Sequence, residues 1–191
     1  MQNYEEAAAA GAQMGEIGFA SPRYVFFDSK YIKKDPGYKQ GTLEKQIAAH
    51  KQNGMRVIAT FPPGNQGQMW EEHPDWRVWP KPGAAPEVDL KTQPDGGAMC
   101  ETGPWSDVMI ECMAEILTQY PDVDGFGFDG IHHSTVCYCP HCTKAWAEET
   151  GTQPPPQDLN NEQSRRYQLF LDRRMENTIE RMQKRIKGIN P

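Results

Sequence analysis

The sequence predicts an α/β fold built on a parallel sheet. Three short apolar runs have the character of buried parallel strands: 24–28, 56–61 and 124–129. Segments with helical spacing alternate with these runs: 3–14, 42–53, 106–120 and 162–187. A doubly wound sheet and a (β/α)8 barrel both fit this order, since both consist of right-handed βαβ units. Long segments follow the strands and short ones follow the helices, which favours a barrel with its active face at the strands' carboxyl ends.

The first half of the chain accounts for two of these helices and two strands. The helix at 3–14 is rich in alanine and is expected to stop at Gly15. The strand at 24–28 ends in Asp28, so a carboxylate is expected at the carboxyl edge of the sheet. Thr42 is a suitable cap for the helix that precedes the second strand.

A long segment, residues 62–103, separates the second strand from the next helix. It is rich in Pro, Gly and Trp, and loops of this length inside a compact domain are usually functional. Four of the five tryptophans lie in it or beside it: Trp70, Trp76, Trp79 and Trp105. Flat rings near acidic residues suit sugar binding, so we take Trp70, Trp76 and Trp79 as candidate substrate-binding residues. The alternative is that these rings pack inward and hold the loop in place.

The third strand ends in a second candidate carboxylate, Asp129. A carboxylate at this position can act as general acid, general base or nucleophile toward a bound substrate. It can equally accept backbone N–H bonds where the strand turns into the loop. Two histidines follow it, and we take His132 and His133, with Asp28, as candidate substrate-binding residues. Asp124, at the start of the strand, is expected to be structural.

Three cysteines in the next loop form a C-x-C-x-x-C pattern, Cys137, Cys139 and Cys142. Three thiolates at this spacing can surround one soft cation, and structural zinc sites take four ligands. Cys100, in the preceding loop, is the expected fourth ligand. Histidines compete with it for that place: His132, His133 and His141. A thiol redox pair without metal is the alternative, and Cys112 is expected to be a core residue of its helix.

The last helical segment, 160–188, is long, amphipathic and basic. Its apolar residues recur at helical spacing: Tyr167, Phe170, Leu171, Met175, Ile179, Met182 and Ile186. Such a helix can bind nucleic acid or an acidic membrane, but more often it is an outer helix with a solvated polar face. The latter is the interpretation adopted.

Composition and charge exclude several classes of protein. The 191 residues carry a net charge of −6, which argues against a protein that coats nucleic acid. No apolar run approaches the ~18 residues of a transmembrane helix. The N-terminus is acidic and has no basic region before an apolar stretch, so no secretory signal is predicted and a cytoplasmic location is expected.

Three of these segments resemble a known group of enzymes. The runs VDGFGFDG at 123–130, CYCPHC at 137–142 and EETG at 148–151 are similar to (β/α)8 glycoside hydrolases of the β-galactosidase type. The sequence resembles glycoside hydrolase family 42 and, more closely, the related hypothetical glycosyl hydrolases whose fourth strand reads VDGIFFDG. The segments HPDW at 73–76 and HKQNGMRVI at 50–58 fit the same group.

The resemblance implies a structural zinc ion held by Cys100, Cys137, Cys139 and Cys142. In family 42 the general acid/base is the Glu of an Asn-Glu pair that ends the fourth strand, and Phe128-Asp129 stands there in this sequence. In other retaining barrel hydrolases an Asp at this place is the nucleophile. The resemblance also implies that residues 1–191 form a single, incomplete barrel domain with only the second, third and fourth strands.

The sequence therefore predicts a partial (β/α)8 glycoside hydrolase with Asp129 as nucleophile or acid/base. The expected partners are a carbohydrate substrate and either the remainder of the barrel or further copies of the chain, with no nucleic acid and no membrane. The second catalytic carboxylate would lie on a later strand, so the isolated chain could be inactive. The alternative is a zinc-stabilised carbohydrate-binding or scaffold domain without catalysis.

Overall fold

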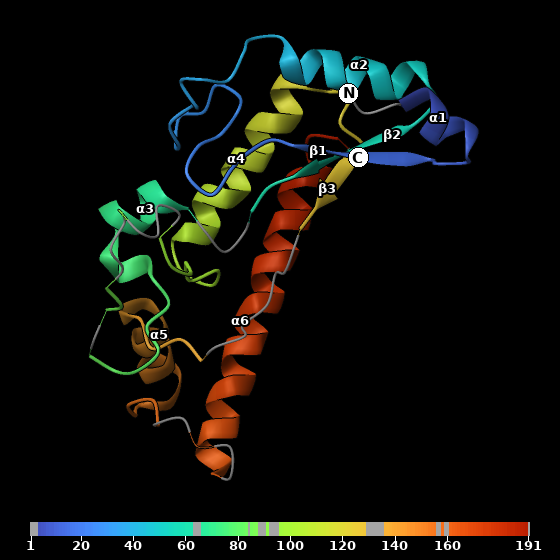
Figure 1. Ribbon diagram of the computed structural model, residues 1–191. Coiled ribbons are helices and arrows are strands. Elements are labelled where there is room, and N and C mark those ends of the chain that lie inside the picture. Colours follow the sequence, from blue (N-terminus) through green and yellow to red (C-terminus); the bar gives the residue numbers. More distant parts are fainter. Residues whose placement is uncertain are drawn as a thin grey trace.

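The computed structural model describes residues 4–62, 66–83, 85–87, 91, 96–128, 136–155, 158 and 161–190. Its helices and strands are α1 (Tyr4–Ala9), β1 (Met14–Gly18), α2 (Thr42–Gln52), β2 (Arg56–Thr60), α3 (Gly67–Glu72), the 3-10 helix η1 (Pro74–Trp76), α4 (Trp105–Gln119), β3 (Gly125–Gly127), α5 (Pro140–Thr150) and α6 (Glu162–Lys187) (Figure 1). No helix among them is both long and apolar enough to cross a membrane.

The three strands form one parallel sheet in the order β1-β2-β3. Ile17 of β1 stands beside Ala59 of β2, which stands beside Phe126 of β3. Parallel neighbours need a crossover connection, and α2 and α4 supply it between successive strands. The described residues thus confirm the predicted α/β class with a small parallel sheet.

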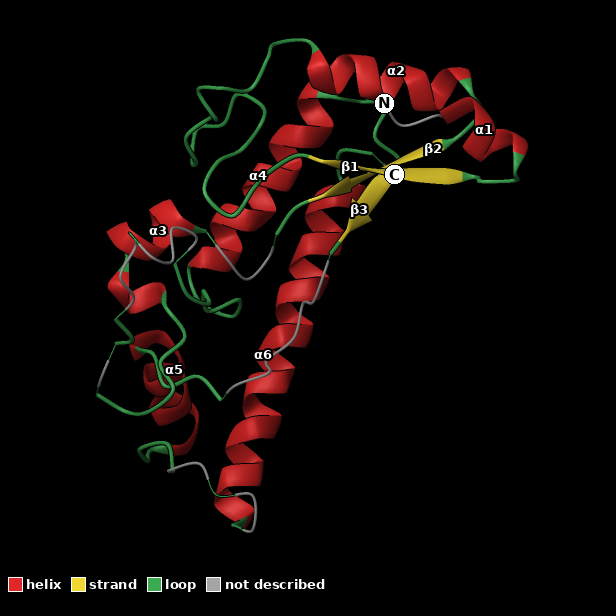
Figure 2. Ribbon diagram, viewed as in Figure 1, coloured by secondary structure: helices red, strands yellow, loops and turns green. Residues whose placement is uncertain are grey.

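Helices cover one face of this sheet and build the main core (Figure 2). Ile17, Val57 and Ala59 from the strands are at most 3% exposed. They share a cluster with residues of α2, α4 and α6: Leu43, Ile47, Trp105, Met109, Ile110, Cys112, Met113, Ile116, Leu117 and Met182. We call this cluster the sheet core. Its helical members recur every three or four residues, the period that places side chains on one helix face.

A second, smaller hydrophobic cluster is separate from the sheet core. It joins four cysteines to α5 and the first half of α6, with these members: Cys100, Val136, Cys137, Tyr138, Cys139, Cys142, Trp146, Tyr167, Phe170 and Leu171. Trp146 meets Tyr167 and Phe170 edge-on, at ring-centroid distances of 5.1 and 5.3 Å. We call this cluster the cysteine module.

Helix α6 connects the two clusters, and its predicted bounds are confirmed. The Asn161 side chain accepts a hydrogen bond from the Gln163 N–H and caps the first turn. The predicted apolar stripe is buried except at Ile186, which is partly buried, and at Ile179, which is 36% exposed. Three arginines of the basic face pair with acids on neighbouring helices: Arg173 with Glu149, Arg181 with Asp107 and Arg185 with Glu111. These pairs fit the interpretation of an outer helix.

The prediction of the first strand was wrong. Residues 24–28 are not a strand, although Val25 and Phe27 are fully buried, and the sheet strand is Met14–Gly18. The apolar composition of the 24–28 run reflects packing of a loop against the core. The true strand lacked that signal because Gly15 lies against α2, where an added Cβ would be 2.2 Å from His50 Nε2.

Two further differences concern helix ends and the long loop. α1 ends at Ala9, because the chain turns at Gly11 (φ 94°) to enter β1. Within 62–103 the structure contains α3 and η1, where the sequence predicts a loop. The Gln66 side chain caps α3 by accepting the Met69 N–H. Thr42 does not act as an N-cap, since its hydroxyl donates to the Lys39 carbonyl instead.

Candidate functional site

A cavity of about 540 Å³ lies at the carboxyl ends of the three strands, on the face turned away from the sheet core. Glu16 of β1, Thr60 of β2 and Gly127 of β3 each contribute to it. Its remaining walls come from the segments that leave the strands: Ala20, Pro22, Phe61, Pro62 and Phe128. Ligands of parallel α/β folds bind at this end of the sheet, because strand-end loops converge there.

Glu16 is the acidic residue among the described residues that line this cavity. The sequence analysis does not predict it as a site residue. It is exposed and belongs to a strand with glycine on either side. Its carboxylate reaches toward β3, since a Cβ added at Gly127 would lie 3.8 Å from Glu16 Oε1. The only sequence signal was the exposed Glu16 next to the buried Ile17, with Gly15 and Gly18 on either side of the pair, which has the alternation of a half-buried strand.

Three of the predicted site residues lie outside the described part of the chain: Asp129, His132 and His133. The last described residues before them, Gly127 and Phe128, both line the cavity.

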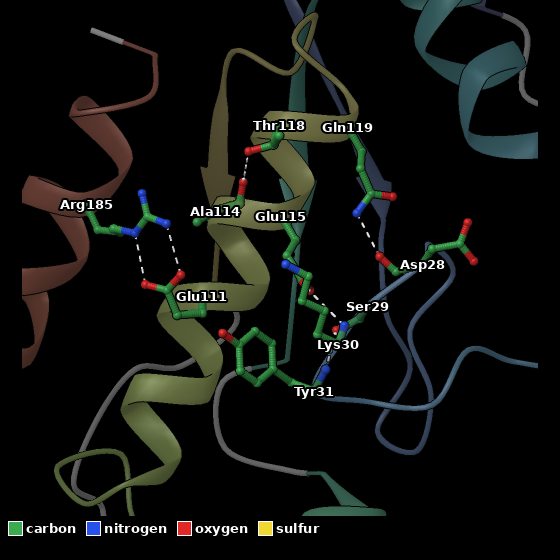
Figure 3. Close-up of a pocket in the computed structure, with 10 residues that line it drawn as sticks. All are labelled: Asp28, Ser29, Lys30, Tyr31, Glu111, Ala114, Glu115, Thr118, Gln119 and Arg185. Atoms are coloured by element: carbon green, nitrogen blue, oxygen red, sulfur yellow. Dashed lines mark hydrogen bonds and ion pairs between the residues drawn. The ribbon is translucent and has the colours of Figure 1, made fainter.

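Asp28 does not lie at a strand end (Figure 3). Its carboxylate is 86% exposed and pairs with Lys34 Nζ at 3.0 Å, while its carbonyl accepts a 2.7 Å hydrogen bond from Gln119 Nε2 at the end of α4. It lines a separate pocket of about 450 Å³, together with α4 and Arg185. Asp28 therefore sits on the outer helical layer and takes no part in the strand-end cavity.

Trp70 is packed inside the long loop. Its ring is 2% exposed. The Arg77 guanidinium lies 3.7 Å from the ring centroid, and Arg77 Nε donates to the Trp70 carbonyl at 2.7 Å. Gly96 and Gly97 pack against the ring, where a Cβ would come within 3.0 Å. The long loop itself thus covers much of this side chain.

Trp76 and Trp79 remain half-buried. Trp76 stacks on His73 with ring centroids 3.7 Å apart. Trp79 Nε1 donates to the Pro74 carbonyl at 3.0 Å, and its ring packs against the cysteine module. Neither lines the strand-end cavity.

The structure brings together all four predicted cysteine ligands. Cys100, Cys137, Cys139 and Cys142 are 0% exposed, and their Sγ atoms lie within 4.8 Å of one another. The Cys100 and Cys142 sulfurs are 3.5 Å apart. The competing His141 lies outside this cluster and instead contacts Asp75, with Nε2 2.9 Å from Oδ2.

Backbone hydrogen bonds join the segment around Cys100 to Trp76 and the segment around Tyr138 to Trp79. The Cys100 N–H donates to the Trp76 carbonyl at 2.7 Å, and the Tyr138 N–H donates to the Trp79 carbonyl at 2.8 Å. Cys139 caps α5 in an extended conformation, so that Cys142 lies in the first turn of the helix. The C-x-C-x-x-C spacing thus combines an extended stretch with a helical turn, and both present sulfur to the same point.

The thiol pKa values of Cys100, Cys137 and Cys139 are shifted in different directions. Hydrogen bonds from Cys137, Cys139 and Cys142 hold the pKa of the Cys100 thiol well below its usual value, despite its burial. The bonds to Cys100, together with burial, raise the pKa of Cys137 and of Cys139. The buried cluster therefore favours a thiolate at Cys100, and a divalent cation would take the place of the remaining thiol protons.

This donor set fits a tetrahedral metal ion. With zinc–sulfur bonds of about 2.3 Å, sulfurs in a tetrahedral site lie about 3.8 Å apart, close to the spacing seen here. Four soft sulfur donors in a closed, buried site are typical of structural zinc. The cluster can therefore hold one metal ion.

Cys112 and Asp124 lie outside these sites, and both have the structural roles that the sequence predicts. Cys112 is a core residue, 0% exposed, and burial raises its thiol pKa to about 12. Asp124 precedes β3, and its Oδ2 accepts hydrogen bonds of 2.6 Å from both the Val57 N–H and Lys51 Nζ. That carboxylate ties the end of α2 and the start of β2 to the start of β3.

Comparisons of the sequence found no counterpart: no protein-family model matches it, and no curated protein sequence does. Solved structures do match. The chain is similar to α-L-fucosidase isoenzyme 2 from Paenibacillus thiaminolyticus, with a TM-score of 0.75 and 23% sequence identity. That match covers 99% of this chain and 27% of the fucosidase.

Two β-galactosidases give similar matches. The enzyme from Bacillus circulans sp. alkalophilus has a TM-score of 0.65 and 15% identity, covering 98% of this chain and 32% of the enzyme. The enzyme from the psychrophilic Marinomonas ef1 has a TM-score of 0.60 and 16% identity, covering 97% and 32%. The chain thus spans about a third or less of these proteins, and it has the fold of a part of these glycosidases.

Proposed function

We propose that the chain is part of a (β/α)8 glycoside hydrolase that cleaves O-glycosidic bonds by carboxylate catalysis. The observation that carries this proposal is the strand-end cavity, with a carboxylate at Glu16 and with Gly127 two residues before Asp129. The fold shared with parts of a fucosidase and two β-galactosidases supports the same reaction class.

Asp129 is the proposed nucleophile or general acid/base. Glycoside hydrolysis needs two carboxyl groups on either side of the scissile bond, about 5–9 Å apart. Glu16 offers a carboxylate to the strand-end cavity, and we assign to it the binding of sugar hydroxyls. Trp76, Trp79, His132 and His133 remain predicted substrate-binding residues.

The cysteine cluster is the proposed site of a structural zinc ion. Cys100, Cys137, Cys139 and Cys142 would hold it, and a closed four-sulfur site leaves no open position for a substrate. Its role would be to fix the loop before α4 and the loop after β3 to each other.

The proposal includes partners for the sheet. Within the described residues, β1 and β3 each pair with β2 alone. Unpaired strand edges offer backbone N–H and C=O groups to further strands. We propose that strands from the remainder of the barrel, or from another copy of the chain, pair there.

The test is hydrolysis of nitrophenyl α-L-fucoside and nitrophenyl β-D-galactoside by the complete barrel that contains this chain, and by its Asp129→Asn variant. We expect release of nitrophenol from one of these substrates by the wild type, and a loss of at least about 1,000-fold in the variant with unchanged circular dichroism. Asp122→Asn, an exposed acid before β3, is the matched control and should keep full activity. Equal turnover in wild type and Asp129→Asn would contradict the proposed catalytic role of Asp129.

A non-catalytic carbohydrate-binding domain is the second candidate. It is favoured by Phe128-Asp129 standing where the resemblance expects Asn-Glu, and by Glu16 being the one acid among the described residues of the cavity. Titration with L-fucose and D-galactose, followed by NMR, separates the two. Binding without hydrolysis supports this candidate, whereas hydrolysis abolished in Asp129→Asn excludes it.

A further inference from the structure

Thr102 lies against the sulfur cluster without being one of its ligands. The residue is 6% exposed, and its hydroxyl oxygen is 3.5 Å from both Cys100 Sγ and Cys142 Sγ. Within the described part of the chain, these two sulfurs are the hydrogen-bond partners of that hydroxyl. A buried hydroxyl is thus aimed at the pair of cysteines that come from two different segments of the chain.

The chemistry of the pair decides the direction of the hydrogen bond. A hydroxyl has one proton to donate, whereas a metal-bound thiolate has only lone pairs and can only accept. With both sulfurs ionised, Thr102 must donate to one of them. Hydrogen bonds to ionised acceptors are stronger than those between neutral groups, and inside a buried site they lose little to solvent.

Helix α6 fixes the position of this hydroxyl from behind. Arg174 Nη2 donates to the Thr102 carbonyl at 2.7 Å. The same guanidinium lies 5.7 Å from the Phe170 ring centroid, within the cysteine module, and its Nε is buried without a hydrogen-bond partner. A cation is therefore held in the shell around the cluster, and it anchors the backbone that carries the hydroxyl.

We propose that Thr102 is a positioning residue of the metal site, whose hydroxyl donates to the thiolate of Cys100 or Cys142. Four thiolates around a divalent cation leave a net charge of −2, and each donated proton reduces the charge on the accepting sulfur. The donated hydrogen bond strengthens retention of the cation and fixes the two cysteines relative to each other. This inference rests on the proposed metal role of the four cysteines.

The experiment compares metal binding by the full chain and by Thr102→Val, which removes the hydroxyl and keeps the shape. Zinc affinity is measured by competition with a chromogenic chelator, and Co²⁺ is used as a spectroscopic probe. We expect zinc binding to weaken about 10–100-fold in Thr102→Val, as is typical when a group that hydrogen-bonds a metal ligand is lost. The sulfur-to-cobalt charge-transfer band should move to lower energy, because a sulfur without the hydrogen bond releases electrons more easily.

Matched variants keep the result interpretable. Thr102→Ser retains the hydroxyl and should restore both readouts, and Thr102→Ala should reproduce the loss if valine disturbs folding. Thr118→Val on α4, whose hydroxyl donates to the Ala114 carbonyl, should leave both readouts unchanged. Wild type that binds zinc and cobalt with the same affinity and band energy as Thr102→Val would overturn this inference and leave the metal site standing. Wild type that binds neither ion would overturn the metal site itself.

Discussion

The sheet core and the cysteine module hold the same chain together by different means. In the sheet core, a parallel sheet and three helices bury some twenty apolar side chains, and the hydrogen-bonded strands set the arrangement. In the cysteine module, a shorter helix and a few aromatic rings surround four buried cysteines. Cys100 lies at one end of the long loop, and the other three follow β3.

The difference teaches which part of the fold depends on chemistry beyond apolar burial. The sheet core has the content of an ordinary hydrophobic core, which apolar burial alone can stabilise. The cysteine module places four titratable thiols in its centre, and burying such groups costs free energy unless a partner compensates. We therefore expect the two regions to respond separately to loss of metal, to cavities and to pH.

The largest effect is expected from Cys139→Ser, which removes one of the four sulfurs. Structural zinc supplies about 10–16 kcal/mol of binding free energy in small metal-folded peptides, so its loss should release the module. Hydrogen exchange measured by mass spectrometry should show lost protection in α5 and the first half of α6. β2 and α4 should stay protected.

Cys112→Ala is the control for that experiment, because Cys112 is equally buried but belongs to the sheet core. It should retain metal and module protection. Loss of protection in β2 and α4 together with α5 in Cys139→Ser would show that the two regions are one cooperative unit, contrary to the comparison.

A smaller effect, confined to the sheet core, is expected on the free energy of unfolding from Ile116→Ala on α4. Ile116 is 0% exposed in the sheet core, and truncating a buried isoleucine to alanine costs about 2–4 kcal/mol. Urea unfolding followed by circular dichroism should show this loss, while zinc content stays that of the wild type. Ile179→Ala, at a position 36% exposed, should cost less than about 1 kcal/mol. A loss of zinc in Ile116→Ala would contradict the separation.

The smallest effect is expected from Asp124→Asn, which tests the ion pair at the start of the sheet. Burial alone would raise the pKa of Asp124, but hydrogen bonds from Lys51 and the Val57 N–H outweigh it and lower that pKa. A carboxyl whose folded pKa lies below its unfolded value of about 3.9 stabilises the fold when ionised. Its contribution is therefore full above pH ~4 and is lost as the pH falls through the lowered pKa.

We expect Asp124→Asn to cost about 1 kcal/mol at neutral pH, since the side chain is 32% exposed and solvent weakens the pair. Unfolding free energies of wild type and variant, measured from pH 7 down to pH 2, should converge at the acid end. A gap between the two proteins that stays constant over this range would show that the carboxylate charge is not what stabilises this corner.

Much of the fold could be predicted from spacing along the chain. The bounds of α2, α4 and α6 agree with the predictions within one residue, because each has an amphipathic pattern long enough to define its buried face. β2 was found for a similar reason, as its β-branched and apolar residues alternate with the pleat. β1 was missed because close approach of His50 selects glycine there and removes the apolar signal.

The residues of the candidate sites likewise divide into those that could be predicted from the sequence and those that could not. The cysteine set could be predicted because three ligands are local in sequence and their spacing reflects the shape of one turn. Glu16 and Thr102 could not, since Glu16 depends on the register of β1 against β2 and β3, and Thr102 depends on how two distant loops meet. The role of Trp70 likewise depends on Arg77 and two glycines filling the space around its ring.

The most direct test of the account is the metal content of the purified wild-type chain, measured together with thiol reactivity. We predict about one zinc ion per chain, with the four module cysteines protected from a thiol reagent until a chelator removes the metal. Cys112 should react only on unfolding, because it is buried and its pKa is raised to about 12. Purified chain without metal, with its module cysteines free to react or joined in disulfides, would contradict the account.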